Sequence, residues 1–235
     1  MITKKALKQI NLLGTKKARK TQQSFVVEGI KSVEEFVTQG FEQRGIYAVS
    51  PTSFEGADLV TENEMQKMSF LKNASPVLGV FALPENKTIP VKGRILVLDQ
   101  VADPGNLGTI LRICDWFEIR CLVCSLDTVD CYNPKVVQAS MGSLARVECH
   151  YTDLADFLTN DKRPVYGAFL EGKSIYESNL SDDAILVMGS EANGISEKIT
   201  SCIDQKITIP KTNTNGPESL NVAIATALIL GEISR

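Results

Sequence analysis

Short apolar runs alternate along the chain with longer segments in which apolar residues recur every three or four positions. In the second half of the sequence, runs of strand length stand at 94–98, 119–124, 165–170, 185–188 and 207–209. Segments with helical spacing lie between most of them, at 107–117, 134–141, 154–158 and 220–233. Strands that alternate with helices in this way predict an α/β fold with a mostly parallel sheet, covered by helices on both faces.

The first 84 residues show the same alternation on a smaller scale and predict a small α/β domain. Strand-like runs stand at 25–27, 46–49 and 77–83, and helical patterns at 3–13, 29–37 and 62–68. Residues 16–23 are polar and basic, and we expect a connector there. Pro84 and Pro90 bracket a polar segment typical of a linker. The sequence therefore predicts two domains, 1–84 and 92–235, joined by a linker at 85–91.

Charge is distributed unevenly along the chain. The net charge of −3 argues mildly against a nucleic-acid partner. Before Glu28, however, there is no acidic residue and there are seven basic ones: Lys4, Lys5, Lys8, Lys16, Lys17, Arg19 and Lys20. The remainder carries 18 basic against 28 acidic residues. A basic segment attached to an otherwise acidic chain is consistent with phosphate binding. The alternative interpretation is that these residues form a solvated helix face.

Hydropathy and cysteine usage predict a reduced, cytoplasmic protein. No apolar run approaches the roughly 18 residues of a membrane span, and no signal-peptide pattern opens the chain. The six cysteines are scattered, as expected of free thiols. Cys121, Cys124, Cys131, Cys149 and His150 are of residue types that bind zinc, but Cys121 and Cys124 would face opposite sides of one strand. We therefore expect no metal.

Three polar motifs accompany the predicted strands of the second domain. The first spans 98–112 and includes Asn106 and Arg112, the second is Gly189-Ser-Glu-Ala-Asn-Gly194, and the third joins Ile209-Pro210 to Ser219-Leu-Asn-Val222. The carboxyl ends of strands are where open α/β sheets bind ligands. In this order the motifs resemble the signatures of the SpoU (TrmH) family of RNA ribose 2′-O-methyltransferases.

The resemblance implies a fold, a cofactor and a substrate class. Family members use S-adenosylmethionine, and they tie the carboxyl-terminal segment into a trefoil knot, against general folding rules. The first domain resembles the ribosomal-protein-like RNA-binding domain of many members, chiefly in Arg19 and in residues 25–29. Ribosomal RNA is favoured over transfer RNA because of this extra domain. The residues expected to contact RNA are Lys16, Lys17, Arg19 and Lys20.

The resemblance also assigns residues to the active site. Positions that match the family's backbone contacts to the adenosyl group are Gly189, Ile209 and Leu220. Positions that match its catalytic set are Asn106, Arg112, Glu191, Ser219 and Asn221. Ser219 and Asn221 stand where the last helix begins, so a capping role is an alternative for both. No metal is required, because the sulfonium is already an activated methyl donor.

Arg112 and Asn106 can be weighed on physical grounds. Arg112 falls off the apolar side of its predicted helix, so its guanidinium can clamp an RNA phosphate. The family proposal makes it the proton acceptor, but an arginine pKa above about 12 leaves almost no neutral form. Asn106 is about 120° away around an ideal helix, so a shared site would require it to lie in the preceding loop or at the helix cap. Glu191 could pair with Arg112 or fix its own loop.

Two rival functions and one assembly state follow from the same residues. A transfer-RNA methyltransferase would share the motifs, and a non-catalytic RNA-binding or ribosome-assembly factor would share the fold, although the complete catalytic set argues against the latter. The helix over 220–233 is apolar nearly all round, so its outer side needs cover. Family members pair through this region, and we expect a homodimer.

The loop at 211–217 is longer and more polar than the resemblance leads us to expect.

Overall fold

The computed structural model describes residues 2–85, 87–213 and 215–235. The chain forms two compact units. The amino-terminal unit comprises residues 1–86 and 130–146, and the carboxyl-terminal unit comprises 87–129 and 147–235. This grouping differs from a simple division of the sequence, because residues 130–146 join the first unit. The boundaries at 84 and 92 stay a prediction. The expected linker includes Asn86 and the polar loop includes Thr214, which lie outside the described residues.

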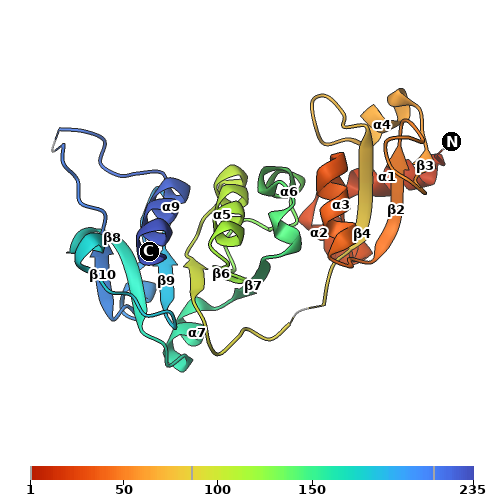
Figure 1. Ribbon diagram of the computed structural model, residues 1–235. Helices are drawn as coiled ribbons and strands as arrows, with labels where there is room; N and C mark the ends of the chain where they lie inside the picture. The colour runs from red at the N-terminus through yellow and green to blue at the C-terminus, as the bar shows by residue number, and fades with distance from the viewer. Residues whose placement is uncertain (1, 86, 214) are drawn as a thin grey trace. The chain divides into compact units, whose positions relative to one another are not determined.

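A six-stranded sheet forms the centre of the carboxyl-terminal unit (Figure 1). Its strand order is β10-β8-β9-β5-β6-β7, and every pairing is parallel. The strands are β5 (Ile95–Leu98), β6 (Cys121–Ser125), β7 (Glu148–Thr152), β8 (Val165–Ser174), β9 (Ile185–Met188) and β10 (Gln205–Thr208). The predicted mostly parallel sheet is confirmed. Edge strand β7 was not predicted, because its half-buried sequence lacks an apolar run.

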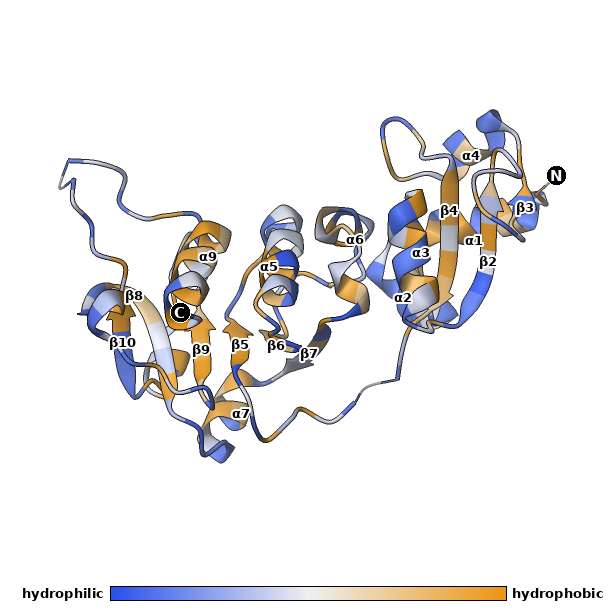
Figure 2. Cartoon of the chain, viewed as in Figure 1, coloured by the Kyte–Doolittle hydropathy of each residue, from blue (hydrophilic) through white to orange (hydrophobic). Residues whose placement is uncertain are grey.

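Helices cover both faces of this sheet. They are α5 (Pro104–Trp116), α7 (Leu154–Asn160), α8 (Glu197–Thr200), α9 (Val222–Ile233) and the 3₁₀ turn η2 (Ile175–Glu177). Leu154 of α7 and Ile199 of α8 pack against Val97 and Val187 on one face, while α5 and α9 contact each other on the opposite face (Figure 1). Strands β5 and β9 are wholly buried and apolar (Figure 2). No helix in the described ranges is both long and apolar enough to span a membrane. The trefoil knot stays a prediction.

The amino-terminal unit contains a four-stranded sheet with the order β1-β4-β2-β3. Its strands are β1 (Ser24–Glu28), β2 (Gln43–Ala48), β3 (Asp58–Leu59) and β4 (Val77–Ala82). Its helices are α1 (Lys4–Leu12), α2 (Lys16–Gln22), α3 (Ile30–Thr38), α4 (Glu62–Met68) and α6 (Pro134–Ser140), with the 3₁₀ turn η1 (Ser143–Ala145). Val26 and Leu78 pack with residues of α1 and α4 on one face. The rings of Phe25, Phe36 and Phe81 pack together within the unit.

Residues 130–146 are built into the core of the amino-terminal unit. The Tyr132 ring lies 4.6 Å from the Phe25 ring between centroids, and α6 contacts β1. Arg146 forms an ion pair with Glu35 of α3. The amino-terminal unit is therefore completed by a segment that lies between β6 and β7 in the sequence.

Arg19 belongs to the core of the amino-terminal unit and not to an RNA-binding surface. Residues 16–22 form helix α2, where the sequence predicted a connector, and Thr15 caps the helix by accepting from the Ala18 N–H at 3.3 Å. Arg19 is only 2% exposed. Its guanidinium donates to Asp130 Oδ2 at 2.5 Å and 3.1 Å and to the Leu13 carbonyl at 2.8 Å. The expectation that Arg19 contacts RNA is therefore wrong, because its donors are buried and satisfied.

We expect Arg19→Ala to lower the free energy of unfolding by about 3 kcal/mol, because it leaves the mostly buried Asp130 carboxylate without its cation. Denaturant unfolding of the full chain measures this change. Arg44→Ala is a suitable control, since Arg44 pairs with Glu42 at the surface of the same unit and should cost less than about 1 kcal/mol. Equal stability of the two variants would contradict a structural role for Arg19.

Candidate active site

The three sequence motifs meet in the carboxyl-terminal unit because of strand pairing. Strands β5 and β9 are neighbours, and Leu98 is paired with Met188 at their carboxyl ends. The segments that begin at Asp99 and Gly189 therefore leave the sheet side by side. Helix α9, which begins at the last residue of the third motif, packs on α5, which contains the end of the first motif. Ligands bind at such carboxyl ends of parallel strands.

A chain of side-chain hydrogen bonds joins the motifs. The Asn221 amide donates to Asn106 Oδ1 at 2.8 Å, and the Asn106 amide donates to Glu191 Oε1. Asn221 Oδ1 accepts from the N–H groups of Ala223 and Ile224, at 2.9 Å and 3.3 Å. Because the backbone donors at the start of α9 set the orientation of Asn221, each amide in turn has a defined donor and acceptor end. We call these three residues the Asn221–Asn106–Glu191 chain.

Asn106 lies within a helix and is neither in the preceding loop nor at the helix cap, the two places expected for it if it shared a site with Arg112. Helix α5 begins at Pro104, so Asn106 lies inside its first turn, and the helix cap is Asp103, which accepts from the Asn106 N–H at 2.8 Å. Asn106 thus contacts Glu191 through its side chain from within the helix. At the start of α9 the cap is Asn221, and Ser219 is exposed and precedes it. The alternative that Ser219 caps this helix is therefore wrong.

The loop that carries Glu191 closes on itself. Ser190 and Gly194 exchange two backbone hydrogen bonds, at 3.0 Å and 2.9 Å, and Gly194 has a φ of +65°. A Cβ built at Gly189 would stand 2.1 Å from the Gly194 carbonyl carbon and 2.2 Å from the Ile195 nitrogen. The close approach that requires glycine at position 189 is therefore made by the loop's own backbone.

Asp99 is a further anchor of this loop, and the sequence motifs did not predict it. Asp99 is 3% exposed, and its Oδ2 accepts from the Ser196 N–H at 2.8 Å. Its own N–H donates to the Met188 carbonyl at 2.9 Å. Asp99 therefore ties the end of the Glu191 loop to the segment that leads to Asn106. The sequence shows an aspartate directly after an apolar strand, but many loops that precede helices also contain one, so this feature did not single out Asp99.

Arg112 stands apart from the Asn221–Asn106–Glu191 chain. It is exposed on α5, about 9 Å along the helix axis from Asn106. Within the described part of the chain it has no hydrogen-bond or ion-pair partner, so the possible pair with Glu191 is not formed. A free guanidinium on an exposed helix face can take a phosphate in two-pronged fashion.

The residues expected to hold the cofactor flank the polar loop after β10. Ile209 is half-buried and Leu220 is 46% exposed. Among the described residues, the backbone N–H and C=O groups of both lack a hydrogen-bond partner. Free backbone donors and acceptors beside apolar side chains suit an adenine-like ring, which needs both. The binding of the cofactor by Gly189, Ile209 and Leu220 stays a prediction.

The cysteines and the histidine form no metal-binding group within the described ranges. Burial raises the pKa of the Cys121 thiol to about 12 and that of Cys114 further, so both are neutral and poor ligands. Burial also lowers the pKa of His150, against the opposing effect of Glu148. His150 lies on edge strand β7, away from the three motifs along the sheet.

Comparison with known proteins adds two family matches. Residues 93–231 match the model of the SpoU rRNA Methylase family, and residues 4–79 match that of the MRM3-like substrate binding domain. One relative is the 23S rRNA (guanosine(2553)-2′-O)-methyltransferase RlmP of Bacillus subtilis. It is 28% identical over 230 residues, which cover 93% of this chain and 91% of that protein.

Two solved structures resemble the whole chain. A structure from Porphyromonas gingivalis, assigned to the TrmH family of RNA methyltransferases, is 38% identical, with a TM-score of 0.91 and coverage of 99% of this chain and 98% of that one. An rRNA methyltransferase from Sinorhizobium meliloti with bound AdoMet is 26% identical, with a TM-score of 0.85 and coverage of 99% and 95%.

Proposed function

Since the chain belongs to the SpoU rRNA methylase family, we propose that it transfers a methyl group from S-adenosylmethionine to a ribose 2′-hydroxyl of ribosomal RNA. The observation that carries the proposal is the Asn221–Asn106–Glu191 chain, which assembles all three motifs at one end of the sheet. The names of the relatives support ribosomal RNA as the substrate.

The chemistry requires a held cofactor, a positioned hydroxyl and a proton acceptor. The sulfonium of the cofactor supplies an activated methyl group, and the backbone of Gly189, Ile209 and Leu220 would hold it. Glu191 accepts from Asn106 through Oε1, which leaves Oε2 able to accept the hydroxyl proton. Arg112, always charged, binds an RNA phosphate and does not act as the base.

The decisive experiment is methyl transfer from labelled S-adenosylmethionine to ribosomal RNA, with transfer RNA as the competing substrate, followed by mapping of 2′-O-methyl sites. Calorimetry with S-adenosylmethionine and its demethylated product, repeated with a chelator present, tests the cofactor separately. RNA binding without turnover would favour the non-catalytic factor. Preference for transfer RNA would keep the enzyme and change its substrate.

The basic helices α1 and α2 should supply RNA affinity. Replacing Lys16, Lys17 and Lys20 together by glutamine should weaken RNA binding and flatten its salt dependence, because each lost phosphate contact removes about 0.7 to 0.9 from the log–log slope. Fluorescence anisotropy at several salt concentrations measures the slope. Replacing Lys31, Lys67 and Lys72 removes the same charge from other exposed sites of the same unit. An equal loss in both variants would mean that only net charge matters.

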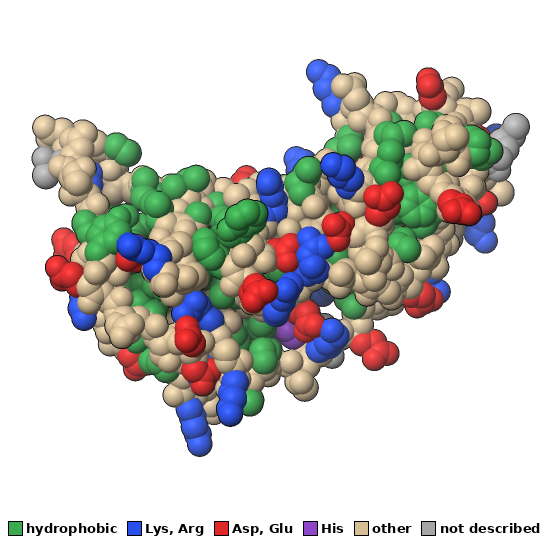
Figure 3. Space-filling view, viewed as in Figure 1, with side chains coloured by type: hydrophobic (Ala, Val, Ile, Leu, Met, Phe, Trp, Pro, Cys, Tyr) green, Lys and Arg blue, Asp and Glu red, His purple; other side chains and the backbone are tan. Residues whose placement is uncertain are grey.

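We also propose a homodimer through α5 and α9. Trp116 is 83% exposed, Ile224 52% and Leu228 44%, and the two helices contact each other. Apolar side chains are visible at the surface over these helices (Figure 3). Arg112 lies one turn before Trp116, so such an interface would bring Arg112 beside the partner subunit. We also propose a cytoplasmic location, which the scattered spacing of the cysteines supports.

We expect Ile224→Asp with Leu228→Asp to convert a dimer into a monomer, because two charges would have to be buried in the interface. Sedimentation at micromolar concentration measures the mass. Val91→Asp is the control, since Val91 is 83% exposed and lies on neither helix. A wild-type chain that sediments as a monomer with full activity would refute the dimer.

A further inference from the structure

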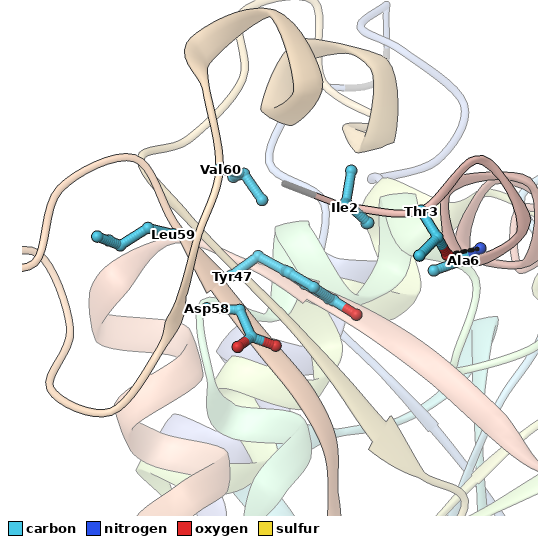
Figure 4. A pocket seen from close by; sticks show the side chains of 7 residues that line it. All are labelled: Ile2, Thr3, Ala6, Tyr47, Asp58, Leu59 and Val60. Carbon is cyan, nitrogen blue, oxygen red and sulfur yellow. Dashed lines mark hydrogen bonds between the residues drawn. The ribbon is translucent and has the colours of Figure 1, made fainter.

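Two open hollows lie along helix α1 in the amino-terminal unit. One has a volume of about 480 Å³ and is lined by Ile2, Thr3, Ala6, Tyr47, Asp58, Leu59 and Val60 (Figure 4). The other, of about 320 Å³, is lined by residues of α1, by Gln22 and by Arg44. Both hollows include Ala6 and Tyr47 in their lining. The Tyr47 side chain therefore stands where the two hollows meet.

The Tyr47 ring is held flat against strand β2. A Cβ built at Gly45 would stand 3.1 Å from the Tyr47 hydroxyl oxygen and 3.3 Å from Cζ, so the ring lies over Gly45. Tyr47 is half-buried and packs beside the core cluster that contains Leu78 and Val80. The ring is thus supported on one side by the strand and borders open space on the other. Its hydroxyl has no hydrogen-bond partner among the described residues.

The surroundings of the ring combine apolar walls with one carboxylate. Figure 4 shows the Tyr47 ring with Asp58 on one side and Ile2 and Val60 on the other. Burial raises the pKa of Tyr47, and the charge of Asp58 raises it further, so the phenol is neutral at pH 7. Asp58 is exposed, and an ionised carboxylate can only accept hydrogen bonds.

The charged residues that line the two hollows are Asp58 and Arg44, and basic residues lie on the adjoining helices. Helices α1 and α2, which line the hollows, carry six exposed lysines and no acidic residue: Lys4, Lys5, Lys8, Lys16, Lys17 and Lys20. Arg44 at the second hollow is exposed and pairs with Glu42 at 3.1 Å. An aromatic ring beside a basic surface is the arrangement by which proteins hold unpaired nucleotides.

We propose that this hollow is a subsite for one unpaired nucleotide of the RNA substrate. Its base stacks on the open face of Tyr47 and donates an amino hydrogen to Asp58, while the lysines of α1 and α2 hold neighbouring phosphates. The subsite deepens the proposed function and rests on it. Adenine, cytosine and guanine carry an exocyclic amino group, whereas uracil offers only its N3–H, so we expect adenylates and cytidylates to bind more tightly than uridylates.

The test uses the full chain and labelled oligonucleotides of about ten adenylates, cytidylates or uridylates, since single-strand sites span about 4–16 nucleotides. Tyr47→Leu keeps an apolar side chain on the core and removes the aromatic face, and Tyr47→Phe keeps the face and removes the hydroxyl. Tyr176→Leu is the control, because Tyr176 is 62% exposed in the other unit. Thermal unfolding shows that each variant remains folded.

We expect Tyr47→Leu to weaken binding of adenylates about 5- to 150-fold with no change in salt slope, because stacking involves no phosphate. Tyr47→Phe should bind within about twofold of wild type, and Asp58→Asn should reduce the preference for adenylates and cytidylates over uridylates. Unchanged affinity in Tyr47→Leu, or equal loss in Tyr47→Phe, would overturn the subsite. A wild-type chain that binds no RNA at all would instead overturn the proposed function.

Discussion

Replacing Arg112 by alanine should lower methyl transfer by at least about 10²- to 10³-fold while leaving the fold and cofactor affinity nearly intact. Arg112 is proposed to bind an RNA phosphate and so to position the 2′-hydroxyl, and misplacement of a reacting group by about 1 Å can cost about 10²-fold in rate. The fold should not suffer, because Arg112 is exposed and has no hydrogen bond or ion pair within the described residues. Single-turnover methyl transfer, calorimetry with S-adenosylhomocysteine and thermal unfolding measure the three quantities.

Two further variants sharpen this test. Arg112→Lys keeps the positive charge but loses two-pronged phosphate binding, so it should recover only part of the activity. Arg120→Ala removes another exposed arginine of the same unit, one that pairs with Asp115 at 3.4 Å, and should leave turnover unchanged. Full turnover in Arg112→Ala would remove this residue from the active site.

Replacing Gly189 by alanine should abolish cofactor binding. The new methyl group would stand 2.1 to 2.3 Å from backbone atoms of Gly194 and Ile195, so the loop that carries Glu191 must move. Such a movement would break the hydrogen bonds between Ser190 and Gly194 and displace Glu191 from Asn106. We expect the dissociation constant of S-adenosylhomocysteine to rise at least about 100-fold, which corresponds to about 2.7 kcal/mol.

Gly231→Ala provides the matched control for the Gly189 variant. A Cβ at Gly231 would stand 3.8 Å from Phe117 Cζ, which is ordinary contact, and alanine favours the helix by about 1 kcal/mol relative to glycine. This variant should bind the cofactor normally and be slightly more stable. Normal cofactor binding in Gly189→Ala would show that the loop geometry is not needed for the site.

The elements that the sequence predicts best are those with a continuous apolar signal. Strands β5 and β9 read as apolar runs because they are buried on both faces, and the apolar side of α5 is buried at Leu107, Ile110 and Leu111. Strand β7 and helix α2 escaped prediction. The first is a half-buried edge strand, and the second is a polar helix whose one buried side chain is an arginine. Apolar periodicity carries no information about either.

Apolar periodicity and motif order are properties of neighbours along the chain, so they were enough to predict the α/β class, the family and the motif residues. Contacts between residues distant in the sequence became apparent only in the folded chain. Arg19 and Asp130 are 111 positions apart, Asp99 and Ser196 are 97, and Asn106 and Asn221 are 115. A lysine-rich segment predicts a charged surface, but only packing shows that its arginine turns inward to a buried carboxylate. Asn106 likewise reaches Glu191 only because the pairing of β5 with β9 brings the second motif beside the first.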